Sequence, residues 1–468
     1  MKKHVLFIDA KNPGVLVENL YPPLWPAFLA AYVEHELGDK LEFHYCRRFS
    51  ESKLQQINPD LVAISSVTQN YNIANRIAEA AKKMGLPVVL GGMHISSLPS
   101  SLSTHMDVAC LGEGEETFMD LMRLFLEEGK FTYNPLNSIP GIAFHNEDQL
   151  IVTEVRRNIP DINSLPHPKR SLIGYEQRAY VYSTRGCAYQ CVFCSCNRFW
   201  GKVRYASVDY ILEELKELIA HGTRIVRFAD ENLISNIPRL EEIAEKIRSQ
   251  GLNRQLKFSC WCRANNLTPD VIATLKSMNI VSVKLGLESG NQRILDYLKG
   301  GVTVEQNEYA IRLLKEAGIQ ANSDFLFGIP DETPEEMKDT YNFIRRSRID
   351  LVEVNIFSPL PGTPVWNNAK ANGLVDDYKM DWSRLNYKFK NNEKRIIHMS
   401  NLLSHHELKH IHRRFQRLRI QRFLRALPKS PWLCELPLIM MKYTQIKAIH
   451  SIRRFVSYIG NAFRFTTG

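Results

Sequence analysis

The chain has 468 residues, of which 44% are hydrophobic and 24% charged, the composition of an ordinary globular protein with room for two or three domains. Its nine cysteines are odd in number and cluster around one motif, which does not indicate a framework of disulfides. The sequence therefore favours a reducing, cytoplasmic compartment. No run of about 20 apolar residues is uninterrupted, and Asp9 breaks the first apolar segment. The sequence therefore predicts neither a membrane-spanning helix nor a signal peptide.

The net charge of +10 is distributed unevenly along the chain. Residues 381–468 contain 18 Lys and Arg against 4 Asp and Glu, a net charge of +14, so the first 380 residues carry −4. The basic character therefore belongs to the C-terminal region.

Residues 1–135 alternate short apolar segments with amphipathic ones. Strands are expected at 4–10, 41–46, 61–67, 87–92 and 108–114, and helices at 24–37, 70–84 and 115–129. Buried strands joined by helices predict a doubly wound, flavodoxin-like parallel sheet, in which ligands bind at the carboxyl ends of the strands. Glycines at those ends let the backbone approach a large ligand closely. The pattern alone fits either a cofactor-binding domain or an unliganded packing domain.

A connector at 136–178 leads to a second series of strands and helices over 179–380. The strands are expected at 180–185, 224–230, 256–263, 280–289, 321–330 and 351–360. Six strand–helix repeats predict a partial, six-stranded (β/α)6 barrel whose reactive face lies at the carboxyl ends of its strands. Residues 381–468 follow as a basic helical region.

Cys187, Cys191 and Cys194 follow the first of these strands with C-x3-C-x2-C spacing. Three thiolates on one short loop can bind three irons of a [4Fe–4S] cluster and leave the fourth iron open. The alternatives are core cysteines or a zinc site, although zinc sites more often add a second pair of Cys or His ligands. Cys196 is not expected to bind, because a fourth thiolate would block the open iron.

This spacing resembles that of the radical S-adenosylmethionine superfamily, as do the segments 196–207, 229–232, 285–290 and 325–333. The resemblance implies that S-adenosylmethionine contacts Phe193, Asp230, Asn232, Arg263, Glu288, Ser289 and Gly328. Alternatively, the acidic, amide and hydroxyl side chains in this set cap the helices that follow them, as such residues commonly do.

Residues 59–66, 88–102 and 111–118 resemble the cobalamin-binding domain that precedes the radical domain in many enzymes. The resemblance implies that the corrin or its nucleotide tail is lined by Ser65, Ser66, Thr68, Gly91, Gly92, His94, Glu113 and Gly114.

Tightly ligated cobalamin proteins carry the motif D-x-H-x-x-G after the first strand. This chain reads Asp9-Ala-Lys11-Asn-Pro-Gly14 there, with Lys in place of the cobalt-binding His. A histidine ligand from this loop is therefore not expected. His94 is not a proven substitute, because a lone His in a glycine-rich turn more often makes hydrogen bonds.

Two further cysteines, Cys260 and Cys262, alternate along one expected strand and so face the same side of it. They are candidates to donate a hydrogen atom to a substrate radical, or they are small core residues.

The basic C-terminal region mixes Arg and His with apolar residues at helical spacing. It fits a helical cap whose Arg stems cover apolar surface of the barrel, or a helix lying on an anionic membrane surface. Nucleic-acid binding is not expected, since no recognisable nucleic-acid fold accompanies the charge.

Together these resemblances imply an oxygen-sensitive enzyme with an iron–sulfur cluster. The cluster would receive an electron from a donor such as flavodoxin or ferredoxin and would pass it to S-adenosylmethionine. The resulting 5′-deoxyadenosyl radical would abstract a hydrogen atom from an unactivated carbon of a small-molecule or lipid substrate, which then receives a methyl group from cobalamin. Rearrangement, cyclisation or oxidation is the alternative outcome. A non-catalytic cobalamin-binding sensor or scaffold is the alternative of another class.

Overall fold

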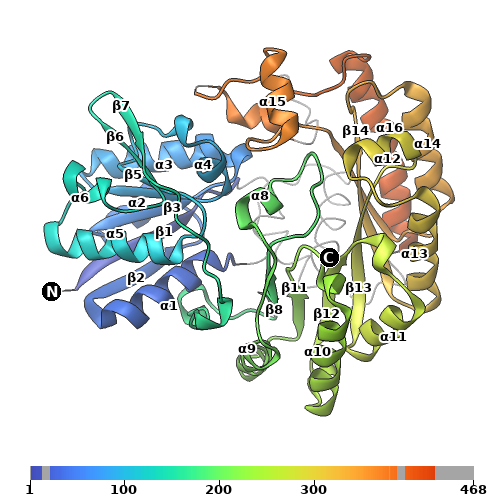
Figure 1. Cartoon of the computed structure of the whole chain (residues 1–468), viewed down its shortest axis with the longest axis horizontal. Coiled ribbons are helices and arrows are strands. Elements are labelled where there is room, and N and C mark those ends of the chain that lie inside the picture. Colours follow the sequence, from blue (N-terminus) through green and yellow to red (C-terminus); the bar gives the residue numbers. More distant parts are fainter. Residues whose placement is uncertain (1, 13–21, 379, 387–395, 427–468) are drawn as a thin grey trace. The chain divides into compact units, whose positions relative to one another are not determined.

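The computed structural model describes residues 2–12, 22–378, 380–386 and 396–426. The chain divides into two compact units, each built around a sheet (Figure 1). The first unit comprises Met1–Gly174, Cys194–Arg204 and Pro359–Leu385, and the second comprises Tyr175–Phe193, Tyr205–Ser358 and Asn386–Gly468, each in its described part. Neither unit is continuous in sequence, because the chain leaves and re-enters each of them.

A seven-stranded sheet with the order β2-β1-β3-β4-β5-β6-β7 forms the centre of the first unit. Its strands are β1 (Lys3–Asp9), β2 (Leu41–Cys46), β3 (Leu61–Ser65), β4 (Val88–Gly91), β5 (Val108–Cys110), β6 (Ile142–Asn146) and β7 (Gln149–Val152). The first five are parallel and have the flavodoxin-like order, which confirms the predicted doubly wound sheet. The antiparallel β6–β7 hairpin extends this sheet and lies in the segment predicted as a connector.

The helices of the first unit are α1 (Trp25–Leu37), α2 (Glu51–Ile57), α3 (Tyr71–Lys83), α4 (Met93–Ser97), α5 (Glu115–Glu128), α6 (Tyr133–Asn137), α7 (Arg170–Ile173), α8 (Cys196–Trp200) and α15 (Pro364–Ala371). Phe7 of β1 lies at the centre of the core. Its ring stacks on Phe43 with centroids 5.3 Å apart and contacts Trp25 of α1 and Phe118 of α5. Burying one such ring stabilises the fold by about 1.5–3 kcal/mol, which ties both helices to the sheet.

The second unit contains a six-stranded sheet with the order β15-β14-β13-β12-β11-β8. Its strands are β8 (Arg178–Val181), β11 (Ile225–Phe228), β12 (Lys257–Cys262), β13 (Ile280–Glu288), β14 (Gln320–Phe327) and β15 (Leu351–Ile356). All adjacent pairs are parallel, which confirms the predicted six-stranded partial barrel. Two short strands, β9 (Thr184–Arg185) and β10 (Arg204–Tyr205), lie on either side of the cysteine loop in sequence.

The helices of this unit are α9 (Val208–Ala220), α10 (Ile237–Ser249), α11 (Pro269–Ser277), α12 (Gln292–Leu298), α13 (Val304–Glu316), α14 (Pro334–Arg346) and α16 (His405–Ala426). Side-chain caps define where several of them begin. Thr303 and Thr333 each form a capping box with the Gln or Glu three residues later, which satisfies backbone N–H groups of the first turns of α13 and α14.

The two faces of the second sheet differ sharply in polarity. On one face Phe228 stacks on Phe258, and Phe325 contacts Phe343 of α14, so this apolar face packs against the helices on the outside of the barrel (Figure 1). The opposite face carries polar side chains, including an ion pair between Lys284 Nζ and Asp324 Oδ2 at 2.7 Å. Because side chains alternate along a strand, the parity of each residue decides which face it occupies.

α16 packs against the outer strand β15. Phe415 and His412 of this helix contact the Phe327 ring, with centroids 5.6 and 5.8 Å away. Arg419 Nε lies 3.2 Å from Glu353 Oε1 on β15, and both side chains are about nine-tenths buried. These contacts support the cap interpretation for this part of the basic region, whereas residues 427–468 lie outside the described residues.

None of the helices within the described ranges combines the length and the apolar character that crossing a bilayer requires.

Candidate functional site

The three predicted cluster ligands lie between β9 and α8. Cys187, Cys191 and Cys194 form no disulfide with another described cysteine, and each is partly exposed. Burial raises the pKa of the Cys187 and Cys191 thiols, so both remain protonated at neutral pH until a metal displaces the protons. Three partly exposed cysteines on one short loop fit an iron–sulfur cluster.

Cys196 differs from these three cysteines because it is buried, with only 5% of its surface exposed. It begins α8, and its backbone N–H donates to Cys194 Sγ at 3.5 Å. The Arg198 guanidinium donates to the Cys194 carbonyl at 2.9 Å. These contacts fix the backbone around Cys194, and the burial of Cys196 agrees with the expectation that it does not bind.

Arg263 supplies a fixed positive charge beside the cysteine loop. Its guanidinium lies 3.9 Å from the centroid of the Tyr189 ring and donates to the carbonyls of Lys299 and Gly300. Its Nη1 is 4.0 Å from Cys191 Sγ. A buried cation held in this way favours negative charge on neighbouring sulfur or on a bound carboxylate.

Asp230 and Asn232 act on the backbone around the site. Asp230 is fully buried, and its carboxylate accepts from the N–H groups of Ser183 at 2.7 Å and Thr184 at 2.9 Å. Burial raises the pKa of Asp230 even though these bonds favour the carboxylate. Asn232 Oδ1 accepts from the Arg263 N–H at 3.1 Å. Asp230 therefore fixes the strand end that leads into the cysteine loop.

Glu288 ends β13 with a φ of +65°, which only a well-determined environment allows for a residue other than glycine. Burial raises its pKa to about 7, while the positive charge of Lys299 opposes the shift. The Lys299 ammonium donates to the Gly286 carbonyl. Glu288 is therefore a buried carboxyl group that titrates near neutrality, as is common at functional sites.

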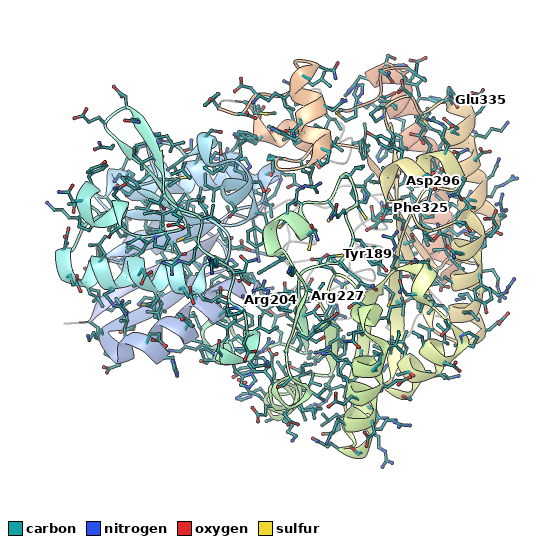
Figure 2. All side chains as sticks on the ribbon, in the orientation of Figure 1. Tyr189, Arg204, Arg227, Asp296, Phe325 and Glu335 are labelled. Carbon is teal, nitrogen blue, oxygen red and sulfur yellow. The ribbon has the colours of Figure 1, made fainter. Side chains whose placement is uncertain are left out.

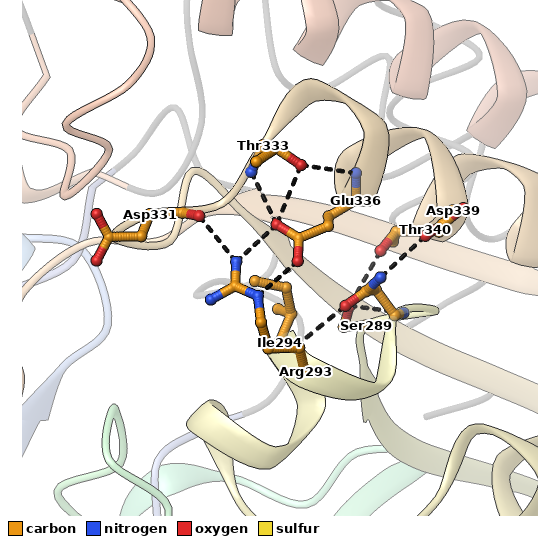
Figure 3. A network of polar contacts seen from close by, with 9 residues as sticks. Ser289, Arg293, Ile294, Asp331, Thr333, Glu336, Asp339 and Thr340 are labelled. Atoms are coloured by element: carbon orange, nitrogen blue, oxygen red, sulfur yellow. Dashed lines mark hydrogen bonds and ion pairs between the residues drawn. The ribbon is translucent and has the colours of Figure 1, made fainter.

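The next residue, Ser289, is committed to packing contacts within the fold. Its hydroxyl hydrogen-bonds Thr340 Oγ1 of α14 at 3.0 Å and accepts from the Asn291 N–H at 3.1 Å (Figure 3). Beside it, the Arg293 guanidinium makes a two-pronged ion pair with Glu336, which lowers the pKa of that carboxyl group to about 2. This network locks the loop after β13 onto α14.

Gly328 and Phe193 occupy turns at the carboxyl side of the barrel. Gly328 has a φ of +78°, and its N–H donates to Glu332 Oε2 at 2.7 Å. Burial raises the pKa of Glu332 to about 8. The Phe193 ring lies edge-on to Phe357 with centroids 6.5 Å apart.

In the first unit, most of the predicted cobalamin-binding residues lie at the carboxyl ends of β3 and β4. Ser66 is buried, and its N–H donates to the Gly91 carbonyl at 3.1 Å, while Ser65 is partly exposed. Gly92 has a φ of +103°, and a Cβ there would stand 2.6 Å from the Ser66 carbonyl oxygen. Only glycine fits this turn. The strand ends beside it are partly exposed, so a large ligand can approach them.

His94 is buried, with 1% of its surface exposed, and both ring nitrogens have partners. Nδ1 lies 3.2 Å from Thr68 Oγ1, and Nε2 lies 3.0 Å from Ser101 Oγ. The Trp382 ring covers it edge-on with centroids 4.5 Å apart. Burial lowers the pKa of His94 to about 3. These contacts favour a structural histidine rather than a cobalt ligand.

Glu113 also has partners within the first unit. Its carboxylate pairs with Arg204 at 2.7 Å and accepts from the Ile159 N–H at 2.8 Å. Gly114 precedes α5 as its N-terminal cap residue. Glu113 therefore positions the loop after β5.

Lys11 occupies the position of the missing histidine. Its Nζ pairs with Asp9 Oδ2 at 3.1 Å, and only 9% of the lysine side chain is exposed. Burial raises the pKa of Asp9, and the lysine charge opposes that shift. A lysine–aspartate ion pair therefore replaces the histidine of the D-x-H-x-x-G pattern.

Cys260 and Cys262 are buried on β12 with their Sγ atoms 3.6 Å apart, so they do face the same side. By strand parity they share that face with Phe258, which stacks on Phe228 on the helix-covered side of the sheet. This position favours a packing role, and the hydrogen-donor role stays a prediction.

Three residues of this region carried no signal in the sequence. Arg204 pairs with Glu113 across 91 residues, and Trp382 covers a histidine 288 positions earlier. Arg239 of α10 donates to the Ser183 and Ala206 carbonyls at 2.9 and 2.8 Å. Each acts through a partner distant in sequence, which neither motif spacing nor periodicity can reveal.

Two family models match the chain in separate stretches. The model of the radical SAM superfamily matches residues 181–344, and the model of the B12 binding domain matches residues 14–122.

Several characterised or named proteins are similar over most of the chain. An uncharacterised methyltransferase from Pyrococcus horikoshii is 30% identical over 381 residues, covering 78% of this chain and 81% of the relative. The anaerobic magnesium-protoporphyrin IX monomethyl ester cyclase of Cereibacter sphaeroides is 27% identical over 78% of this chain and 63% of its own length. The hopanoid C-2 methylase of Rhodopseudomonas palustris is 27% identical over 77% of this chain and 67% of its own.

Two solved structures share the fold. The methyltransferase TsrM from Kitasatospora setae superposes with a TM-score of 0.66 and 19% identity, covering 80% of this chain and 77% of that one. The cobalamin-dependent enzyme OxsB superposes with a TM-score of 0.64 and 17% identity, covering 99% and 79%. With the cysteine loop, both sheets and the 30% identical relative in agreement, the chain belongs to the family of radical S-adenosylmethionine enzymes that carry a cobalamin-binding domain.

Proposed function

We propose that the protein holds a [4Fe–4S] cluster on Cys187, Cys191 and Cys194 and a cobalamin on its first unit, and that it methylates an unactivated carbon of a small-molecule or lipid substrate. The observation that carries the proposal is the set of three partly exposed cysteines on one short loop, in a chain that also has a flavodoxin-like sheet. When bound, the cluster supplies the electron that cleaves S-adenosylmethionine to a 5′-deoxyadenosyl radical, and cobalamin supplies the methyl group.

The residues of the chain would prepare the site in three ways. Asp230 holds the strand end before the loop, and Arg263 places a cation beside Cys191. Glu288, a buried carboxyl group with a pKa of about 7, lies at the carboxyl end of β13, where it can accept a hydrogen bond from ribose or ammonium groups. Because the polar atoms of these residues are fixed by packing, cofactor binding requires little rearrangement.

Product analysis tests the proposal. Protein purified without oxygen and reconstituted with iron, sulfide and cobalamin should form 5′-deoxyadenosine together with S-adenosylhomocysteine when dithionite and a substrate are present. C187A, C191A and C194A should each lose iron and 5′-deoxyadenosine formation, whereas C196A, the buried neighbour, should keep both. Iron retained in the three variants would contradict the assignment of the ligands.

A second outcome has specific support, because one of the similar proteins is a cyclase. Cyclisation, like rearrangement or oxidation, would use the same radical but transfer no methyl group. Formation of 5′-deoxyadenosine without S-adenosylhomocysteine would favour this outcome over methylation. A non-catalytic sensor or scaffold would bind cobalamin but never cleave S-adenosylmethionine.

The partners of the protein follow from this chemistry. The cluster requires a one-electron donor such as flavodoxin or ferredoxin, and the enzyme would work in the reducing cytoplasm. Peripheral contact with the cytoplasmic membrane face would depend on the basic region, so liposome flotation of the full chain against a chain ending near residue 390 tests it. Equal partitioning of the two would remove the membrane contact from the proposal.

A further inference from the structure

Arg227 lies on the polar face of the second sheet, one residue before the carboxyl end of β11, and only 3% of its surface is exposed (Figure 2). The parallel register places it beside Tyr180 of β8 and Ser259 of β12. Its guanidinium carbon is 5.7 Å from the centroid of the Tyr180 ring and 5.3 Å from that of the Trp261 ring. Two aromatic rings therefore surround a buried positive charge on the face where the barrel's chemistry is expected.

This charge is poorly satisfied within the fold. The Arg227 contact with the Tyr180 hydroxyl is long, at 3.4 Å, and among the described residues no carboxylate pairs with its guanidinium. Two buried donors, Arg227 Nε and Trp261 Nε1, have no acceptor among those residues. Buried polar groups are rarely left unpaired, so two such donors on adjacent strands indicate a ligand that supplies the acceptors.

Three other buried arginines make stronger contacts through their guanidinium groups, although Nε of Arg263 and of Arg422 also has no acceptor among the described residues. Arg419 pairs with Glu353, and Arg263 and Arg422 each donate to backbone carbonyls. Their interactions explain why those charges are buried. Within the described residues Arg227 has only the long contact with the Tyr180 hydroxyl and the two aromatic rings, which compensate a buried cation less well than a carboxylate or short hydrogen bonds do.

We propose that Arg227 and the indole N–H of Trp261 bind an oxyanion of the substrate, a carboxylate or a phosphate, and so hold the substrate inside the barrel. This inference rests on the proposed function and names the class of substrate. A guanidinium offers parallel N–H groups that match two oxygens of either anion. The rings of Tyr180 and Trp261 provide apolar surface for the part of the substrate next to the charged group. Lys284, 5.5 Å from the Trp261 ring, adds positive charge nearby, although it pairs with Asp324.

Binding of simple aromatic probes to the reconstituted holoenzyme tests the site. Benzoate and phenyl phosphate represent the two anions, and benzamide is the uncharged counterpart of benzoate. Isothermal titration should show that at least one anion binds the wild type about 10- to 100-fold more tightly than benzamide, as expected for a charge-assisted pair. Whichever of the two anions binds more tightly identifies the carboxylate or phosphate class.

The variants R227M and R227K separate charge from geometry. R227M should remove the preference for the anion, and R227K should keep part of it, because lysine carries the charge without the planar fork. W261F should weaken anion binding several-fold by removing the second donor. R312M is the matched control, since Arg312 is also stacked on a tyrosine, 5.1 Å from the Tyr309 ring, but is exposed on α13. It should leave the preference unchanged.

Cleavage of S-adenosylmethionine without substrate distinguishes this inference from the proposed function. R227M should still form 5′-deoxyadenosine under dithionite and keep its thermal unfolding midpoint within a few degrees of the wild type. Equal binding of anion and amide by the wild type, or an unchanged preference in R227M and R227K, would overturn the anion site. Loss of S-adenosylmethionine binding in R227M would overturn it too, by assigning the arginine to the cofactor. Absence of cleavage in the wild type would instead count against the proposed function.

Discussion

At the scale of single residues, burial and partners decide what a motif residue can do. His94 stands in a glycine-rich turn that resembles a cobalamin loop, yet Thr68 and Ser101 occupy its ring nitrogens and Trp382 covers it. Arg227, which matches no motif, has a buried Nε without an acceptor and no carboxylate partner among the described residues. The sequence identifies the type of residue, whereas the packing around it decides whether that residue is free to bind.

The low pKa of His94, about 3, makes stability depend on pH. The unfolded chain binds a proton to this histidine below about pH 6.5 and the folded chain does not, so stability is full above pH 6.5 and falls as the pH decreases. Between pH 7 and pH 5 the loss should reach about 2 kcal/mol. Urea unfolding at the two pH values should show that the free energy of unfolding falls by about 2 kcal/mol less in H94N than in the wild type. H35N, at an exposed histidine, should behave as the wild type does; equal losses in H94N and the wild type would contradict the buried, neutral histidine.

The Lys11–Asp9 ion pair leads to a spectroscopic prediction. Cobalamin bound in its Co(II) form should show no nitrogen hyperfine splitting from a protein histidine in the wild type. K11H should introduce this splitting in the electron paramagnetic resonance spectrum, because it restores the D-x-H-x-x-G pattern. Histidine splitting in the wild type would mean that another imidazole binds the cobalt.

At the scale of elements, α16 shows how a basic helix can serve packing. Its face toward β15 carries Leu408, Phe415 and Leu418, which are buried, whereas most of its charged residues are exposed. Arg419 and Arg422 are the buried exceptions, with Glu353 and backbone carbonyls as their partners. High positive charge in this segment therefore does not by itself indicate an anionic partner.

The buried ion pair between Arg419 and Glu353 should be essential to this packing. R419M should lower the free energy of unfolding by about 3–5 kcal/mol, because it leaves Glu353 buried without its cation. R425M, at an exposed position on the same helix, should change it by less than about 0.5 kcal/mol. The double variant R419M/E353L should recover most of the loss in urea unfolding. A failure to recover would mean that the arginine stabilises the helix through its other contacts.

At the scale of the whole molecule, the two units carry different predicted cofactor sites. The first unit offers strand ends with a glycine turn, and the second contains Cys187 and Cys191 together with the polar barrel face. Both units are assembled from separate stretches of chain, and residues 194–204 and 359–385 group with the first unit although they interrupt the second in sequence.

Hydrogen exchange should locate cobalamin on the first unit. Hydroxocobalamin at 100 times its dissociation constant should stabilise the segments it binds by about 2.7 kcal/mol against opening. Amides of β3, β4 and the turns after them should exchange more slowly, whereas those of β12 to β14 should be unaffected. Protection confined to the second unit would contradict the assignment of the cobalamin site.

The sequence by itself determined both sheets, because buried strands and amphipathic helices leave periodic patterns over neighbouring residues. It also determined the cysteine loop, because three ligands within eight residues need no long-range contact to be recognised. Only the tertiary structure decided the partners of His94 and Glu113, the face occupied by Cys260 and Cys262, and the incomplete hydrogen bonds of Arg227. These features arise where segments far apart in the chain pack together, and the energy of such contacts depends on geometry that local patterns do not record.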